Sequence, residues 1–261
     1  MEKARVQWLL MLVMILPLSL NAQKKNSKVD RDFYEVTIFH FTKDSQATTI
    51  GNYLEKELMP ALHSQQLIAG VFQPIANDTA LDKKIFLIVQ HASWNDINRA
   101  KNKLKAVDGN VNELFHNAPY ASPAYARKEL MIAEAFPMAT KLMRPKLNAP
   151  LTDRIYEWRS YESATDAKFI NKVKMFNEGG EVALFKRLNF NAIFYASVVA
   201  GGRMPNLIYM TSFETIEDRN AHWKTFGADA EWKKLSSLPE YQNNVSKADI
   251  ILMKAMPYSD F

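Results

Sequence analysis

The sequence predicts an α+β fold in which two tandem ferredoxin-like βαββαβ units close into a pseudo-dimeric α/β barrel. Three observations predict this fold. Similar residues recur at a constant spacing, each copy carries the same order of strand and helix patterns, and the 261-residue chain is 48% hydrophobic, which is ample for packed cores. The repeat carries the most weight, because internal repeats define the architecture of a chain.

The repeat has a spacing of 122 residues, and four pairs of similar residues keep it: Tyr34 and Tyr156, Phe72 and Phe194, Ser93 and Thr215, and Met131 and Met253. Each tyrosine is followed by a glutamate. Ser93 and Thr215 are hydroxyl residues that suit the start of a helix. Two such units can cover the open faces of each other's sheets. Two independent domains are the alternative.

The first unit is predicted over residues 33–136. Tyr34, Val36 and Ile38 alternate with more polar residues, the period-2 pattern of a strand. The apolar residues of 46–63 recur with helical spacing. The other predicted elements are a strand at 70–72, a strand at 84–90, a helix from Ser93 to about residue 107, and a strand at 130–133.

The second unit is predicted over residues 154–258, after a proline-containing linker at 137–153. Its first strand covers 154–161. The run 169–188 has amphipathic helical spacing, and we expect Gly179 and Gly180 to lie inside this helix. Glycine there destabilises a helix by about 1 kcal/mol relative to alanine. We therefore expect a close approach of the helix to the sheet, with room for a ligand as the alternative.

The N-terminal residues predict an export signal over residues 1–22. Lys3 and Arg5 precede an unbroken apolar run from Trp8 to Leu16, and cleavage is expected after Ala22. The run is shorter than the roughly 20 residues that span a bilayer. We therefore expect a periplasmic or secreted protein with no stable membrane anchor; an uncleaved anchor is the alternative.

Composition excludes several kinds of chemistry. The chain has no cysteine, so disulfides and thiol catalysis are excluded. Its net charge of +5 is spread along the sequence, which predicts no nucleic-acid partner. The histidines do not have the spacing of metal ligands, so we expect no metal and no cofactor. The five histidines are His40, His63, His91, His116 and His222.

Several motifs of the second unit give a family resemblance. They are Ile-Tyr-Glu-Trp-Arg-Ser-Tyr at 155–161, Asn-Glu-Gly-Gly-Glu at 177–181, Arg-Met-Pro-Asn-Leu-Ile-Tyr-Met at 203–210, Arg219 with Trp223 and Phe226-Gly227, and Glu-Trp-Lys-Lys at 231–234. Over residues 154–258 the chain resembles the NIPSNAP family of dimeric α/β-barrel proteins. The first unit matches less well, because it has Thr37 where the second has Arg159 and lacks a counterpart of Trp223. The resemblance implies a fold shared with cofactor-free monooxygenases and haem-binding barrels, and no general set of catalytic residues.

The candidate ligand-binding residues lie in the second unit. Side chains alternate along a strand, so Glu157, Arg159 and Tyr161 share one face. Tyr209 on the third strand can meet them and give an aromatic-walled pocket with one ion pair. The full candidate set is Glu157, Arg159, Tyr161, Arg203, Asn206, Tyr209 and Trp223. A structural ion pair at the barrel seam, with Trp223 in the core, is the alternative.

Three functions remain open from the sequence. The first is a non-catalytic barrel that binds a small ligand or a partner, with self-association as a further expectation. The second is a cofactor-independent monooxygenase or isomerase, in which Glu157 or Tyr209 handles protons and Arg159 holds an anion. The third is a haem-binding barrel, with His222 or His91 as the ligand to iron. No catalytic residue is assigned.

Overall fold

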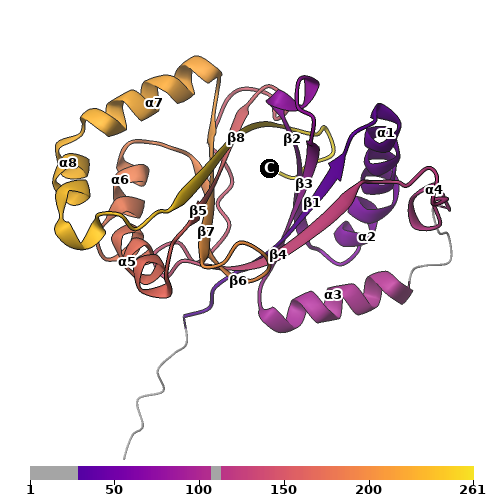
Figure 1. Cartoon of the computed structure of the whole chain (residues 1–261), viewed down its shortest axis with the longest axis horizontal. Helices are drawn as coiled ribbons and strands as arrows, with labels where there is room; N and C mark the ends of the chain where they lie inside the picture. The colour runs from indigo at the N-terminus through magenta and orange to yellow at the C-terminus, as the bar shows by residue number, and fades with distance from the viewer. Residues whose placement is uncertain (1–28, 107–112) are drawn as a thin grey trace, which may run out of the picture.

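The computed structural model describes residues 29–106 and 113–261. The predicted signal peptide at 1–22 lies outside these residues, and so does its cleavage point. Eight antiparallel strands form one closed barrel, with the helices packed on its outside (Figure 1). No helix in the described part of the chain is long and apolar enough to cross a membrane.

The first half supplies four strands. Its elements are β1 (Phe33–Phe41), α1 (Asp44–Tyr53), a π-helical turn (Leu54–Leu58), α2 (Met59–His63), β2 (Ile68–Pro74), a 3₁₀ turn (Ile75–Asp78), β3 (Lys83–His91), α3 (Trp94–Ala106), α4 (Glu113–His116) and β4 (Arg127–Ala135). Ser93 begins α3, as predicted, because its Oγ accepts a hydrogen bond from the backbone N–H of Asp96 at 3.3 Å.

The second half supplies the other four strands. Its elements are β5 (Ile155–Glu162), α5 (Asp166–Asn177), α6 (Glu181–Arg187), β6 (Ala192–Ala200), β7 (Asn206–Phe213), α7 (Ile216–Ala228), α8 (Ala230–Ser237), a 3₁₀ turn (Pro239–Tyr241) and β8 (Lys247–Ala255). Thr215 caps α7 through its side chain, which accepts from the backbone N–H of Asp218.

The order of strands around the barrel is β1-β3-β2-β8-β5-β7-β6-β4, closing on β1. Two seams therefore join the halves: β4 pairs with β6, and β2 pairs with β8. The alternative of two independent domains is wrong, because both seams are antiparallel ladders between strands of different halves. The helices of the first half cover one side of the barrel and those of the second half cover the other (Figure 1).

Side chains alternate between the barrel interior and the helix-covered outer face, which gives three apolar cores. One core fills the interior, and one lies under the helices of each half. Inside the barrel, aromatic pairs cross between the halves. The ring of Tyr34 stacks on Phe194 with centroids 4.5 Å apart, and Tyr156 meets Phe72 at 4.9 Å. The interior is therefore one shared core.

The two glycines expected inside a helix instead separate two helices. α5 ends at Asn177 and α6 begins at Glu181. Gly180 has φ +89°, in the left-handed region that favours glycine. A Cβ on Gly179 would lie 2.5 Å from the carbonyl oxygen of Met175 and 3.0 Å from Leu235 on α8. The expectation of one continuous helix approaching the sheet was wrong, because the glycines permit a sharp change of direction.

The linker at 137–153 contains no helix or strand and bonds to both halves. The backbone N–H of Leu142 donates to the Asp32 carboxylate at 2.9 Å. The backbone N–H of Met143 donates to the carbonyl of Ile193 at 2.9 Å. These bonds fix the linker on the barrel surface.

Candidate functional site

Five of the predicted residues form one cluster between the sheet and the helices of the second half. Glu157 on β5 is fully buried. Its carboxylate accepts from Arg159 Nε at 2.6 Å, from Arg219 Nε at 2.7 Å and from Trp223 Nε1 at 2.7 Å. The Arg159 guanidinium carbon lies 3.6 Å from the centre of the Trp223 ring. This is a cation–π contact on a desolvated ion pair.

The two tyrosines complete the cluster. Arg159 Nη1 donates to the hydroxyl of Tyr161 at 2.7 Å, and the hydroxyls of Tyr161 and Tyr209 lie 3.0 Å apart. Burial raises the pKa of Tyr209 well above its ordinary value. Burial also acts to raise the pKa of Glu157, but hydrogen bonds and charge from Arg219 and Arg159 hold it below its ordinary value. The carboxylate stays charged and the Tyr209 phenol stays protonated near neutral pH. The ion pair belongs to β5 and so does not lie at either seam between the halves.

The Glu157 carboxylate should make stability depend on pH. The folded-state pKa of Glu157 lies below the ordinary value of a glutamate, so its contribution to stability is present above that ordinary value and is lost as pH falls through the folded-state pKa. We expect the free energy of unfolding of the wild type to fall more steeply below about pH 4.5 than that of Glu157→Gln. Urea unfolding across pH 3–7 measures this. Parallel pH profiles for the two proteins would contradict the assignment.

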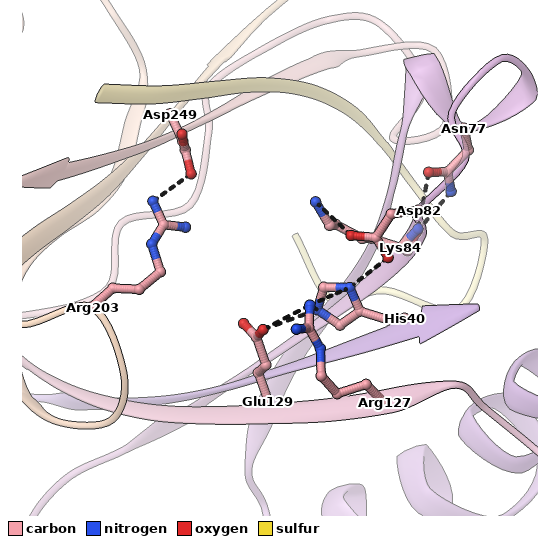
Figure 2. A network of polar contacts seen from close by, with 8 residues as sticks. All are labelled: His40, Asn77, Asp82, Lys84, Arg127, Glu129, Arg203 and Asp249. Carbon is pink, nitrogen blue, oxygen red and sulfur yellow. Dashed lines mark hydrogen bonds and ion pairs between the residues drawn. The ribbon is translucent and has the colours of Figure 1, made fainter. Parts of the chain in front are cut away.

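The other two predicted residues lie apart from this cluster. Arg203, in the β6–β7 turn, pairs with Glu162 and with Asp249. Asn206 is buried and donates through Nδ2 to Ser160 Oγ at 2.9 Å. The guanidinium of Arg203 points toward Asp249 (Figure 2). The structure thus brings five of the seven predicted residues together and places the remaining two near a different feature.

That feature is a cavity of about 220 Å³ at one end of the barrel. Its walls carry charged and polar side chains over an apolar floor. The lining residues are Ile38, His40, Asp82, Lys84, Phe86, Arg127, Glu129, Met131, Trp158, Ser160, Arg203, Lys247, Asp249 and Ile251. These residues come from β1, β3, β4, β5, β8 and two turns, so both halves build the cavity.

The strand period explains why these side chains meet. Tyr34, Val36 and Ile38 point into the barrel, and His40 is the next inward position on β1. On β4, Met131 and Ala133 point inward, and Glu129 follows by the same alternation. Near this end of the barrel, the inward positions change from apolar to polar. The apolar core therefore fills the middle of the barrel, and polar side chains line the cavity at this end.

A polar network surrounds His40, which is 3% exposed (Figure 2). Its Nδ1 lies 2.8 Å from Oδ1 of Asp82, and its Nε2 lies 3.4 Å from Oε1 of Glu129. Nη2 of Arg127 lies 3.1 and 3.2 Å from the two ring nitrogens and 3.0 Å from Glu129. Burial acts to raise the pKa of Asp82, but the hydrogen bond with His40 and the nearby charges hold it below its ordinary value.

The charges on the rim are not fully balanced. Lys84 pairs with Asp82 at 3.4 Å. The two arginines of the rim pair with Glu129 and Asp249. Lys247 has no ion-pair partner within the described residues. One ammonium group therefore remains available to an anionic ligand.

The sequence analysis missed the His40 network. Asp82 and Arg127 lie 42 and 87 positions from His40 in sequence, so no local motif links them. The available signal was the alternation on β1, which assigns His40 to the same face as the buried residues before it. The spacing of the histidines in the sequence carries no such signal.

The two histidines considered as haem ligands lie in different halves, with His222 on α7 and His91 at the end of β3. The described residues contain no cluster of three or more histidine, aspartate or glutamate side chains suited to a metal. Nδ1 of His222 lies 2.9 Å from the carbonyl oxygen of Asp218, and its ring packs against Phe190 and Phe213. His91 is 1% exposed beneath the helices of the first half.

The closed antiparallel barrel with external helices defines the class of dimeric α/β-barrel proteins. Solved structures share this fold. A proposed monooxygenase from Lactobacillus acidophilus NCFM is 8% identical, with 87% of this chain and 94% of that chain covered and a TM-score of 0.55. A proposed monooxygenase from Fusobacterium nucleatum is 12% identical, with 87% and 93% covered and a TM-score of 0.52. An anthrone oxidase-like protein is 8% identical, with 87% and 92% covered and a TM-score of 0.52.

One family model matches the second half of the chain. The NIPSNAP family model matches residues 156–260. This part of the chain is a NIPSNAP domain, as the sequence resemblance implied. A search among curated proteins gives no match.

Proposed function

We propose that this protein binds a small aromatic anion in the barrel-end cavity. The observation that carries the proposal is the Lys247 ammonium, which has no ion-pair partner among the described residues, in a cavity that Phe86 and Trp158 also line. Ligand sites typically combine an apolar wall with a few polar groups that fix orientation. A flat ring would pack on the aromatic floor, and its carboxylate would reach Lys247. A cavity of about 220 Å³ suits a molecule of one or two rings.

We expect 2-naphthoate to quench the fluorescence of the wild-type protein on binding, because Trp158 lines the cavity. Lys247→Ala should weaken this binding by roughly 10- to 100-fold, since a charge-assisted hydrogen bond contributes about 1.5–3 kcal/mol. Fluorescence titration and calorimetry measure the effect. Lys233→Ala removes the same charge from an exposed position on α8 and is the matched control. Equal affinities for wild type and Lys247→Ala would refute the proposal.

A separate experiment tests the enzymatic alternative. A histidine held by a carboxylate can move protons, and the His40–Asp82 pair has this arrangement. An enzymatic role for this pair is tested because proposed monooxygenases share this fold. Oxidation of the CH₂ group of anthrone to a carbonyl would consume one O₂ and release one water. Oxygen uptake with anthrone that is lost in His40→Gln would favour an enzyme. Glu157 and Tyr209 are weaker candidates for this role, because the buried cluster already uses their polar atoms.

The strand pairing supports the duplication inferred from the sequence. α1 and α5 begin at Asp44 and Asp166, and α3 and α7 cover 94–106 and 216–228, all at the spacing of 122. In each half the first strand lies between the third and the fourth. We infer two tandem ferredoxin-like units, with 33–136 and 154–258 joined by the linker at 137–153. The spacing shortens to 120 between the starts of β4 and β8.

We also propose export through residues 1–22, with cleavage after Ala22 and a periplasmic or secreted mature protein. The charged start and apolar run of the sequence support this. Self-association and a partner protein remain predictions. The closed barrel leaves no free edge among the eight described strands, so edge pairing is a poor route to an oligomer.

A further inference from the structure

A second cavity, of about 150 Å³, lies between the sheet and the helices of the first half. It is separate from the barrel-end cavity and shares no residue with it. Its polar lining comes from Glu35, Thr37, His91, Lys101 and Lys128. Most of the remaining wall is apolar and includes Phe39, Leu58, Leu62, Leu87, Val89 and Leu104.

The two halves differ at this place. In the second half the same layer is filled by Glu157, Arg159 and Trp223. The repeat spacing of 122 places Glu35, Thr37 and Lys101 at the equivalent positions of the first half. Threonine is much smaller than arginine, and lysine lacks the rings of tryptophan. The first half therefore keeps space where the second half is packed.

His91 is the second observation that points to a ligand. It is 1% exposed, and neither ring nitrogen has a hydrogen-bond partner within residues 29–106 and 113–261. The closest carboxylate oxygen, on Glu35, is 3.5 Å from Nε2, which is too long for a good hydrogen bond. Buried polar groups usually have a partner, and leaving one without is unfavourable. The equivalent position in the second half is Phe213, which needs none.

The charges around the cavity favour an anion. Lys101 pairs with Glu35 at 3.1 Å. Lys128 has no ion-pair partner within the described residues, and its ammonium is free for a ligand. Leu58, at the end of the π-helical turn 54–58, completes the apolar wall. Turns of this kind occur often at functional sites.

We propose that this cavity binds a small aliphatic carboxylate. The alkyl chain packs against the leucine and valine side chains under α2 and α3. The carboxylate lies at the polar end, where Lys128 and Lys101 balance its charge and His91 donates a hydrogen bond to it. Most of the apolar side chains that line this cavity are branched aliphatic ones. This favours a ligand with an alkyl chain over one with a flat aromatic ring.

Hexanoate is the probe, and isothermal titration calorimetry measures its binding to the full-length protein. We expect one saturable site. The double variant Thr37→Arg/Lys101→Trp gives this layer the residues that fill it in the second half, and should weaken binding at least tenfold. His91→Phe, which places the second-half residue at this position, should do the same. Hexan-1-ol should bind at least tenfold more weakly than hexanoate.

Two control variants test whether the effects are specific to this cavity. One removes a lysine elsewhere on the surface, and the other alters the barrel-end cavity. Lys103→Ala removes a lysine from the exposed face of α3 and should leave hexanoate binding unchanged. Lys247→Ala should also leave it unchanged. Absence of saturable binding to the wild type would overturn the proposal, and so would unchanged affinity in both cavity variants. If the double variant does not fold by circular dichroism, His91→Phe and Lys101→Ala carry the test. Equal affinity for the alcohol would refute a role for the carboxylate.

Discussion

Replacing Glu157 with alanine is expected to lower the free energy of unfolding by about 3–5 kcal/mol. The carboxylate is fully buried and accepts hydrogen bonds from Arg159, Arg219 and Trp223. Its removal leaves two guanidinium groups without their counter-charge, and Arg159 is itself 9% exposed. An unpaired charge of this kind is more unfavourable than the loss of one contact.

Urea unfolding followed by circular dichroism measures the Glu157 effect. Glu35→Ala is the matched control, because Glu35 is the equivalent residue in the first half and pairs with a single lysine. Its side chain is 15% exposed, so solvent can take over much of the interaction. We expect a loss well below that of Glu157→Ala. Similar losses for both variants would show that the buried cluster is not the stabilising feature.

Replacing Phe194 with alanine is expected to lower the free energy of unfolding by about 3–5 kcal/mol. Phe194 is fully buried inside the barrel, where its ring stacks on Tyr34 of the other half and lies 6.2 Å from the ring of Trp158. The shared core also predicts one cooperative transition. Calorimetry of the wild type and the variant should each give a single peak.

Ile170→Ala is the control for the barrel core. Ile170 lies on α5 in the same half and is 61% exposed, so its truncation should change stability by less than about 0.5 kcal/mol. Two separate transitions in Phe194→Ala would show that the halves unfold independently. A loss near that of Ile170→Ala would show that the interior aromatic contacts contribute little.

Much of the fold could be predicted because its signals are local. The alternation around Tyr34 predicted β1, and the helical spacing of 46–63 predicted the helical segment that contains α1 and α2. The spacing of 122 between similar residues then led to the prediction of one closed barrel, which local patterns alone do not give. The Gly179-Gly180 prediction failed because two short amphipathic helices in series look like one helix in sequence. The positive φ of Gly180 is a backbone property that the spacing of apolar residues does not report.

The candidate site was harder to predict. Glu157 and Arg159 are two residues apart on one strand, so their contact followed from the strand period alone. Their role did not follow, because burial and the contacts from Trp223 and Arg219 depend on how α7 packs. His40 and Asp82 come from different strands, and only the barrel closure brings them to one cavity. One sequence signal could have predicted this cavity: a polar residue at the end of a series of inward-facing apolar residues.

The seam between β2 and β8 bears on how the chain folds during synthesis. Strand β2 ends at Pro74, but the residues that pair with it are 253–255. Strand β4 likewise has no partner on one side until β6 has been synthesised. While the ribosome is still translating the second half, the nascent first half exposes two unpaired strands and the interior face of its sheet. Such exposure invites aggregation. A barrel whose seams join β2 to β8 and β4 to β6 therefore cannot close until its last strand, β8, has been synthesised.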